Sequence, residues 1–320
     1  MTAVRARTPM PLYYHPLYTD GIDPSARFPR ERYRKLRARL LGSAGSAVDI
    51  RAAPLASREL LLLAHEASFV DRFLSGALER KERRRVGLRP WTPLLIPRTL
   101  HIVGGALAAL YDVTRQGGIA ANMAGGTHHA HWDWGSGYCV FNDLAVCARV
   151  AVQRLGYRRV LVLDLDVHQG DGTATILSGD ENVRTVSVHC EKNFPFRKAQ
   201  SSWDLGLPEG TGDVAFHRAL DEVLVDAVTY APDLVLFQAG VDGLAADALG
   251  RFALSPEGMS RRNERVFAMC RSRNTPCVVF MGGGYSQPID ATLDAFEDLF
   301  STAAHAHQRY ALSFDDERPV

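Results

Sequence analysis

Short apolar runs alternate with longer segments of helical hydrophobic spacing along most of this chain. Runs typical of buried strands are Ile119–Asn122, Val160–Asp164, Thr185–Val188, Leu234–Gln238 and Cys277–Met281. Segments typical of helices are Ser57–Leu78, Phe141–Leu155, Val214–Tyr230 and Pro256–Arg273. Ser255 as N-cap, Pro256 at the first position and Glu257 in the first turn mark the start of the last helix. This alternation predicts βαβ units, and therefore a mostly parallel sheet between two layers of helices.

Polar side chains follow four of these strands, where each strand is expected to end. Right-handed crossovers bring the carboxyl ends of parallel strands to one edge of a sheet, where ligands bind. The residues that we expect at that edge are His128 and His129, then Asp164, Asp166 and His168, then Asp242, and finally Gly282–Tyr285. The sequence thus predicts a functional site at this edge.

The composition is typical of a globular protein but does not indicate a particular reaction. The 320 residues are 46% hydrophobic, carry a net charge of +1 and contain no linker-like tract or internal repeat, which predicts one domain over residues 1–320. We expect no nucleic-acid partner, no membrane span and no secretory signal. Five cysteines without a C-x-x-C pair favour buried thiols in a reducing cytoplasm. The oligomeric state is not predicted.

Two basic stretches, Arg27–Arg39 and Arg80–Arg89, stand out in an otherwise balanced chain. They could form a surface for an acidic partner, but charge runs more often form solvated helix faces and loops. We favour the second interpretation for both stretches.

Three of the edge residues form a plausible set of metal ligands. Asp164, Asp166 and His168 are spaced two residues apart, so they project to the same side of an extended strand. Asp166, His168 and Asp242 together suit a divalent cation such as Zn²⁺ and leave coordination positions for water and substrate. The alternative is an Asp/His pair in an ordinary strand-to-helix loop.

His128 and His129 lie in the segment AGGTHHAH, and we interpret them as candidate general base and acid. Each would need an orienting carboxylate, and Asp164 and Asp171 are available; the alternative is a pair of ordinary surface or core histidines. His131 and His189 are interpreted as structural. Tyr285 follows three glycines, and its phenol could donate to a developing oxyanion.

These residues together resemble the zinc-dependent histone deacetylase family, which has the arginase/deacetylase fold. The similarity is carried by the segments Gly125–Asp143 (GGTHHAHWDWGSGYCVFND), Asp164–Thr173 (DLDVHQGDGT), Thr185–His189 (TVSVH), Gln238–Asp247 (QAGVDGLAAD) and Gly282–Tyr285 (GGGY). In its compact length and in the segment His189–Lys198, the chain is most similar to class IV-like and bacterial acetoin-utilisation-type members of the family. The resemblance implies a single-domain, three-layer α/β/α architecture.

The resemblance also implies a role for individual residues. Asp166, His168 and Asp242 would bind one zinc ion; Asp164 would orient His128, Asp171 would orient His129, and His129 would be the main general base and acid. Tyr285 would polarise the scissile carbonyl, and Gly137, Tyr138 and Phe194 would line an acyl-lysine tunnel. A potassium ion would be held by the side chains of Asp164 and Ser187 and the backbone carbonyls of Asp166, His168 and Val188.

Some positions depart from the family pattern. Tyr138 stands where a phenylalanine is usual, and Trp132 and Trp134 are bulky for their segment. Leu249 occupies the place of the glutamate that polyamine-specific members carry, which argues against a dicationic substrate.

The leading hypothesis is therefore a zinc-dependent amidohydrolase that removes an acyl group from N-ε-acyl-lysine of a protein or peptide. Alternatives are a deacylase of a small acylated amine such as acetylpolyamine, and a non-catalytic protein that binds acylated ligands. A binuclear manganese ureohydrolase on the same fold is disfavoured because no second D-x-D is present.

Overall fold

A central sheet of eight strands organises the molecule. A computed structural model of the chain describes residues 8–310, and all strand pairs within that range are parallel. The strand order is β2-β1-β3-β8-β7-β4-β5-β6. The strands are β1 (Met10–Tyr14), β2 (Val48–Ala52), β3 (Ile119–Asn122), β4 (Val160–Asp164), β5 (Val183–Cys190), β6 (Trp203–Leu207), β7 (Leu234–Gln238) and β8 (Cys277–Phe280).

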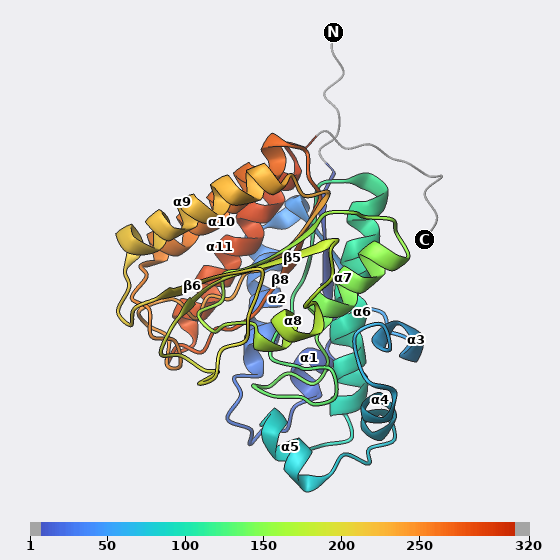
Figure 1. Ribbon diagram of the computed structural model, residues 1–320. Helices are drawn as coiled ribbons and strands as arrows, with labels where there is room; N and C mark the ends of the chain where they lie inside the picture. Colours follow the sequence, from blue (N-terminus) through green and yellow to red (C-terminus); the bar gives the residue numbers. More distant parts are fainter. Residues whose placement is uncertain (1–7, 311–320) are drawn as a thin grey trace.

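Helices cover both faces of this sheet (Figure 1). Helices α6 and α7 pack against one face, and α2, α9, α10 and α11 form the layer on the other. The helices are α1 (Leu17–Asp20), α2 (Glu31–Ser43), η1 (Gly45–Ala47), α3 (Arg58–Leu61), α4 (Ala67–Leu74), α5 (Arg80–Val86), α6 (Leu95–Gln116), α7 (Asp143–Gln153), α8 (Asp171–Ile176), α9 (Asp213–Tyr230), α10 (Pro256–Ser272) and α11 (Asp290–His307). The predicted three-layer α/β/α class is confirmed, and the buried apolar side chains form one core. The predicted domain limits, 1–320, extend at both ends beyond the described residues.

The strands predicted from the pattern of apolar residues are present, as are the helices predicted over Phe141–Leu155, Val214–Tyr230 and Pro256–Arg273. β3, β4 and β7 have the predicted limits, β5 is longer at both ends and β8 is one residue shorter. Every residue of β4, β7 and β8 is buried, as expected for strands covered on both faces. Ser255 caps α10 by accepting a hydrogen bond from the backbone N–H of Gly258, as predicted.

The expected helix over Ser57–Leu78 is wrong as one element, because the structure divides it into α3 and α4. Between them, the backbone N–H of Glu66 donates to the carbonyl of Trp132, and the Glu66 carboxylate caps α4 by accepting from Phe69. His65, in the bend between the two helices, has a fully buried side chain. The tertiary hydrogen bond to Trp132 and the local cap at Glu66 therefore separate the two helices at this point.

The basic side chains of the two stretches are mostly in contact with solvent, as favoured, and Arg32 is the one that is buried. Arg80–Arg89 forms the exposed helix α5 and the loop after it, and most of Arg27–Arg39 lies on the outside of α2. Arg32 is the exception, since it is only 3% exposed and donates to the carbonyls of Gly282 and Gly284. All five cysteines are free and buried. Within residues 8–310, no helix has the length and apolar character needed to cross a membrane.

His65 is buried in its neutral form and joins two parts of the fold. Its Nδ1 donates to the carbonyl of His131 at 3.0 Å, and its Nε2 accepts from the backbone N–H of Asn142 at 2.8 Å. Protonation would remove that acceptor, and burial lowers the pKa of His65 to about 4.

We predict that this histidine makes the fold less stable in acid. An unfolded histidine has a pKa of about 6.5, so below that pH the unfolded chain binds a proton that the folded chain excludes. The contribution of His65 to the free energy of unfolding is therefore fully present above about pH 6.5 and is lost as the pH falls toward 4. Between pH 7 and pH 5 this loss amounts to about 2 kcal/mol. Urea unfolding at pH 7 and at pH 5 gives the change in unfolding free energy between the two pH values. We expect this change to be about 2 kcal/mol smaller in His65→Gln, which keeps an acceptor but cannot titrate, than in the unsubstituted protein. An equal pH dependence in the two proteins would contradict the assignment.

Candidate metal centre and active site

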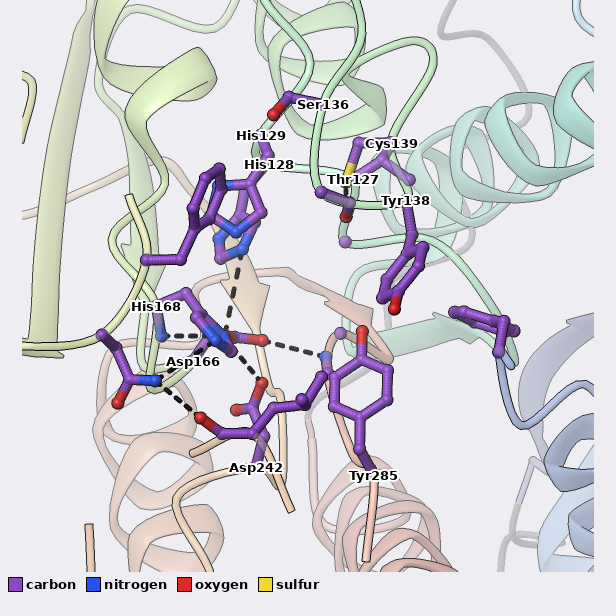
Figure 2. A pocket seen from close by; sticks show the side chains of 18 of the residues that line it. Thr127, His128, His129, Ser136, Tyr138, Cys139, Asp166, His168, Asp242 and Tyr285 are labelled. Atoms are coloured by element: carbon purple, nitrogen blue, oxygen red, sulfur yellow. Dashed lines mark hydrogen bonds and ion pairs between the residues drawn. The ribbon is translucent and has the colours of Figure 1, made fainter. Parts of the chain in front are cut away.

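The predicted site residues meet in a cavity of about 420 Å³ at the carboxyl edge of the sheet. Its floor comes from the segments that follow β3, β4, β7 and β8, as Figure 2 shows for the labelled residues. Its lining includes Phe28, Arg32, His128, His129, Gly137, Tyr138, Asp166, His168, Asn193, Phe194, Asp242, Leu249 and Tyr285. The topology explains this meeting, since β4 pairs with β7, and β8 pairs with both β7 and β3.

The side chains of Asp166, His168 and Asp242 converge at the bottom of this cavity. Nδ1 of His168 lies 3.1 Å from Oδ1 of Asp166 and 3.1 Å from Oδ2 of Asp242. One potential ligand atom from each residue lies within 4.8 Å of the others, and all three side chains are largely buried. Among the described residues, this is the one group of three whose atoms could together hold a metal ion.

Backbone N–H groups hold both carboxylates in place. Gly283 donates to Oδ2 of Asp166 at 2.9 Å, and Val167 donates to Oδ1 of Asp242 at 3.0 Å. Asp242 is therefore fixed by the segment after the neighbouring strand β4, and Asp166 by the segment after β8, which lies two strands away in the sheet. These donors hold the two carboxylates in their mutual positions.

The electrostatics of these three groups fit a bound divalent cation. Burial and the nearby Asp166 carboxylate raise the pKa of Asp242 to about 7, because two negative charges are held together away from water. The two carboxylates outweigh burial at His168 and raise its pKa to about 10. A cation bound by the three groups would relieve the repulsion between the carboxylates and take the place of the proton on His168. Two oxygens and one imidazole nitrogen are donors that suit zinc at a site with open positions.

His128 and His129 lie above this group, and each bonds to a carboxylate of its own. Nδ1 of His128 is 2.7 Å from Oδ2 of Asp164, and Nδ1 of His129 is 2.7 Å from Oδ1 of Asp171. The carboxylates of Asp164 and Asp166 overcome burial and raise the pKa of His128 to about 9. Burial and the neighbouring His128 lower the pKa of His129 to about 3. The two adjacent rings therefore favour opposite protonation states.

Two polar residues that sequence reasoning left out of the site, His131 and Asn193, contact residues that it did assign to the site. Nε2 of His131 lies 3.1 Å from Oδ2 of Asp171, so this carboxylate is shared between His131 and His129. The structural interpretation of His131 overlooked that contact, which its spacing from His129 does not reveal. Asn193 donates to the Leu249 carbonyl at 2.8 Å and places its amide nitrogen 3.5 Å from Nε2 of His168.

The residues expected in the substrate tunnel, Gly137, Tyr138 and Phe194, all line the cavity. Phe194 packs edge-on against His129 with 4.8 Å between ring centroids, and a Cβ at Gly137 would lie 2.5 Å from Cδ2 of the same ring. Tyr138 packs instead on Phe28, with ring centroids 5.2 Å apart. Its φ of 68° is unusual for a residue with a side chain and directs the ring to that side.

Tyr285 faces the cavity from the loop after β8. Its hydroxyl and that of Tyr138 both turn toward the space between the two rings, whose centroids are 6.1 Å apart (Figure 2). Burial raises the pKa of the Tyr285 phenol well above its ordinary value, so the group remains a hydrogen-bond donor. Its backbone N–H donates to Asp247 at 2.6 Å, which anchors the loop.

Three of the residues expected around potassium lie side by side on β4 and β5. Asp164 of β4 and Ser187 of β5 are opposite each other in the sheet register, and Val188 follows on β5. The Ser187 hydroxyl is 3.0 Å from Nδ1 of the buried His189.

Comparison with known proteins identifies relatives over most of this sequence. The profile of the histone deacetylase domain matches residues 27–300. An uncharacterised protein of Picosynechococcus sp. is 42% identical over 281 residues, which cover 87% of this chain and 93% of that protein. Histone deacetylase 2 of Arabidopsis thaliana is 36% identical over 202 residues, 62% of this chain. The match spans about half of that plant protein, 52% of its length.

Two solved structures share the fold at low sequence identity. Acetylpolyamine aminohydrolase from Burkholderia pseudomallei has a TM-score of 0.77 at 20% identity, with 93% of this chain and 99% of that chain covered. The HDA15 HD domain has a TM-score of 0.79 at 20% identity, with 93% and 90% covered. The architecture is thus that of the arginase/deacetylase fold, and the chain belongs to the histone deacetylase family.

Proposed function

We propose that this protein is a zinc-dependent deacylase that hydrolyses the amide of N-ε-acyl-lysine in a protein or peptide. The observation that carries the proposal is the buried Asp166–His168–Asp242 group beneath two histidines that each bond to a carboxylate. Membership of the histone deacetylase family supports hydrolysis of an acylated amine. A protein that only bound acylated ligands would need neither a pair of oriented histidines nor a phenol donor.

Asp166, His168 and Asp242 would hold one zinc ion per chain. When bound, zinc polarises a carbonyl and lowers the pKa of a water molecule, which is the chemistry that hydrolysis of an amide requires. A potassium ion held by Asp164, Ser187 and the carbonyls of Asp166, His168 and Val188 remains a proposal from the family resemblance. A cytoplasmic location is likewise a proposal, supported by the five free cysteines.

His129 would move the proton during hydrolysis. Its Nδ1–H donates to Asp171, which leaves Nε2 as the nitrogen available to the cavity. A neutral Nε2 can accept a proton from the attacking water and then donate it to the departing amine nitrogen. His128, tied to Asp164, would keep a positive charge beside the reacting carbonyl.

Tyr285 would stabilise the negative charge that develops on the carbonyl oxygen. The phenol of the partly buried Tyr285 is protonated, and it faces the same cavity as His128 and His129. A donor that is already in place costs little reorganisation when the charge appears.

The walls above the floor favour a lysine side chain as the substrate. Phe28, Tyr138 and Phe194 present aromatic surface to the cavity, which suits an extended aliphatic stem. Leu249 at the rim offers no carboxylate to the second ammonium group of a polyamine. These features support acyl-lysine over an acetylpolyamine.

We predict that Asp242→Ala removes most of the bound metal. The substitution deletes one of three ligands, so elemental analysis should fall from one zinc per chain to a small fraction of that value. Asp133→Ala, which changes an exposed carboxylate outside the cavity, should retain one zinc per chain. Full zinc content in Asp242→Ala would exclude this residue as a ligand.

Tyr285→Phe should lower kcat on an acetyl-lysine peptide by about 10²–10³, the typical effect of removing one oxyanion donor. Zinc content should not change, since the phenol is outside the ligand group. Tyr111→Phe, a half-buried tyrosine of α6 outside the cavity, is the matched control and should keep full turnover. Undiminished kcat in Tyr285→Phe would overturn the assigned role.

His131 shares the Asp171 carboxylate with His129 and is expected to help hold it in place. Its ring stacks on Trp134 with centroids 3.8 Å apart, so His131→Phe can keep the stack while it removes the contact with Asp171. A less firmly held Asp171 should orient His129 less well, and we expect kcat/KM to fall about tenfold, as for other outer-shell partners. Asp171→Asn should be at least as impaired. Wild-type kcat/KM in His131→Phe would show that the contact has no part in orienting His129.

A further inference from the structure

The mouth of the cavity carries cations from three separate parts of the chain. Arg85 of α5, Lys192 of the segment after β5 and Arg251 of the segment after β7 all contribute to the lining. Within the described chain, the carboxylates in that lining are Asp166 and Asp242, both on the floor. Apart from those two carboxylates and the histidines, the ionisable groups of the lining that can carry a charge near neutral pH are basic.

Arg85 is placed at the mouth without a compensating carboxylate. Its guanidinium carbon lies 4.7 Å from the centroid of the Trp134 ring, which itself stacks on His131. No ion pair involves Arg85 among the residues that the structure describes. Stacking on an aromatic face orients a guanidinium but does not neutralise its charge.

Lys192 and Arg251 share one carboxylate. Nζ of Lys192 is 3.7 Å from Glu209, and Nη1 of Arg251 is 3.6 Å from the same side chain. All three side chains are substantially exposed, so these contacts are loose. Three cations with a single shared carboxylate leave the mouth with a charge of about +2.

The acidic residue nearest to Leu249 in sequence is not available to a substrate. Asp247 accepts hydrogen bonds from the backbone N–H groups of Leu249, Gly250 and Tyr285, at 2.8, 2.9 and 2.6 Å. Its oxygens are thus occupied by the loop, and the rim beside it presents the apolar side chains of Leu249 and Phe196, which are 45% and 89% exposed.

We propose that this enzyme selects acyl-lysines flanked by acidic residues, and that Arg85, Lys192 and Arg251 are the residues that recognise them. The proposal rests on the proposed deacylase function and names its substrate class. Carboxylates on either side of the acylated lysine would meet these cations while the lysine stem enters between the aromatic walls. A polybasic tail or a dicationic amine would instead be repelled before it reached the floor.

A set of three peptides tests the proposal. Each carries a central N-ε-acetyl-lysine, with glutamate, serine or arginine at the two positions on either side. We expect kcat/KM for the glutamate peptide to exceed that for the arginine peptide by about tenfold or more at low salt. The ratio should fall toward one at about 300 mM salt, where the Debye length is only several ångströms.

Charge-reversal variants assign the effect to the three cations. Arg85→Glu should reduce the ratio of glutamate to arginine peptide several-fold, and the triple variant with Lys192→Glu and Arg251→Glu should invert it. Arg218→Glu makes the same change of charge on the exposed outside of α9, away from the cavity, and should leave the ratio unchanged. Because the readout is a ratio, a general loss of activity does not imitate the expected result.

Binding measurements separate this proposal from the underlying function. Fluorescence anisotropy with the same labelled peptides reports the charge preference whether or not turnover occurs. Turnover with equal kcat/KM for the acidic and basic peptides would overturn the proposed selectivity and leave the deacylase function standing. Preferential binding of the acidic peptide without any turnover would support the selectivity of the mouth and overturn the deacylase function.

Discussion

The rest of the site depends on one constraint, which is that two carboxylates, Asp166 and Asp242, are buried within reach of the same imidazole. Separated from water, they repel each other, and this arrangement is stable only when a cation and fixed hydrogen-bond donors compensate the charge. The donors come from the backbone at Val167 and Gly283, directly after β4 and β8. Adjacent parallel strands supply such groups at the same level, so the sheet order β8-β7-β4 makes the site possible.

A buried arginine beneath the site connects the two segments that bear these carboxylates. Arg262 of α10 donates to the carbonyls of Leu165, Ala239 and Gly240, the neighbours of Asp166 and Asp242 in the chain. Its remaining donors go to the side chain of Asn263. Burial lowers the pKa of Arg262 to about 10, which still leaves a positive charge below two negative ones. The helix layer therefore contributes charge to the site as well as packing.

The sequence was sufficient for the central strands and for the polar residues that follow them, because both depend on local pattern. β4 and β7 are continuous apolar runs, and their polar ends could be read directly. The outer strands β1 and β6 could not be predicted in this way, because their sequences are not typical of buried strands. β1 contains Pro11, and β6 is a half-buried strand that includes Asp204 and Gly206. α6 passes through Gly104, where a Cβ would lie 2.1 Å from the carbonyl oxygen of Pro54, so close packing keeps a glycine within the helix. Contacts such as that between His131 and Asp171 join distant segments and have no signature in spacing.

The charged side chains that line the cavity are acidic on the floor and basic at the mouth. A cation held by the floor carboxylates would largely cancel their field at the distance of an approaching substrate. The field that remains is that of the mouth, where Arg85, Lys192 and Arg251 lie on loops and on the short helix α5 rather than on the sheet. Loops can vary without disturbing the strand ends, so the preference for a substrate's charge can change while the floor keeps its chemistry. With the proposed selectivity, the residues at the mouth would decide which substrate reaches the floor, while the floor residues would carry out the same chemistry on each.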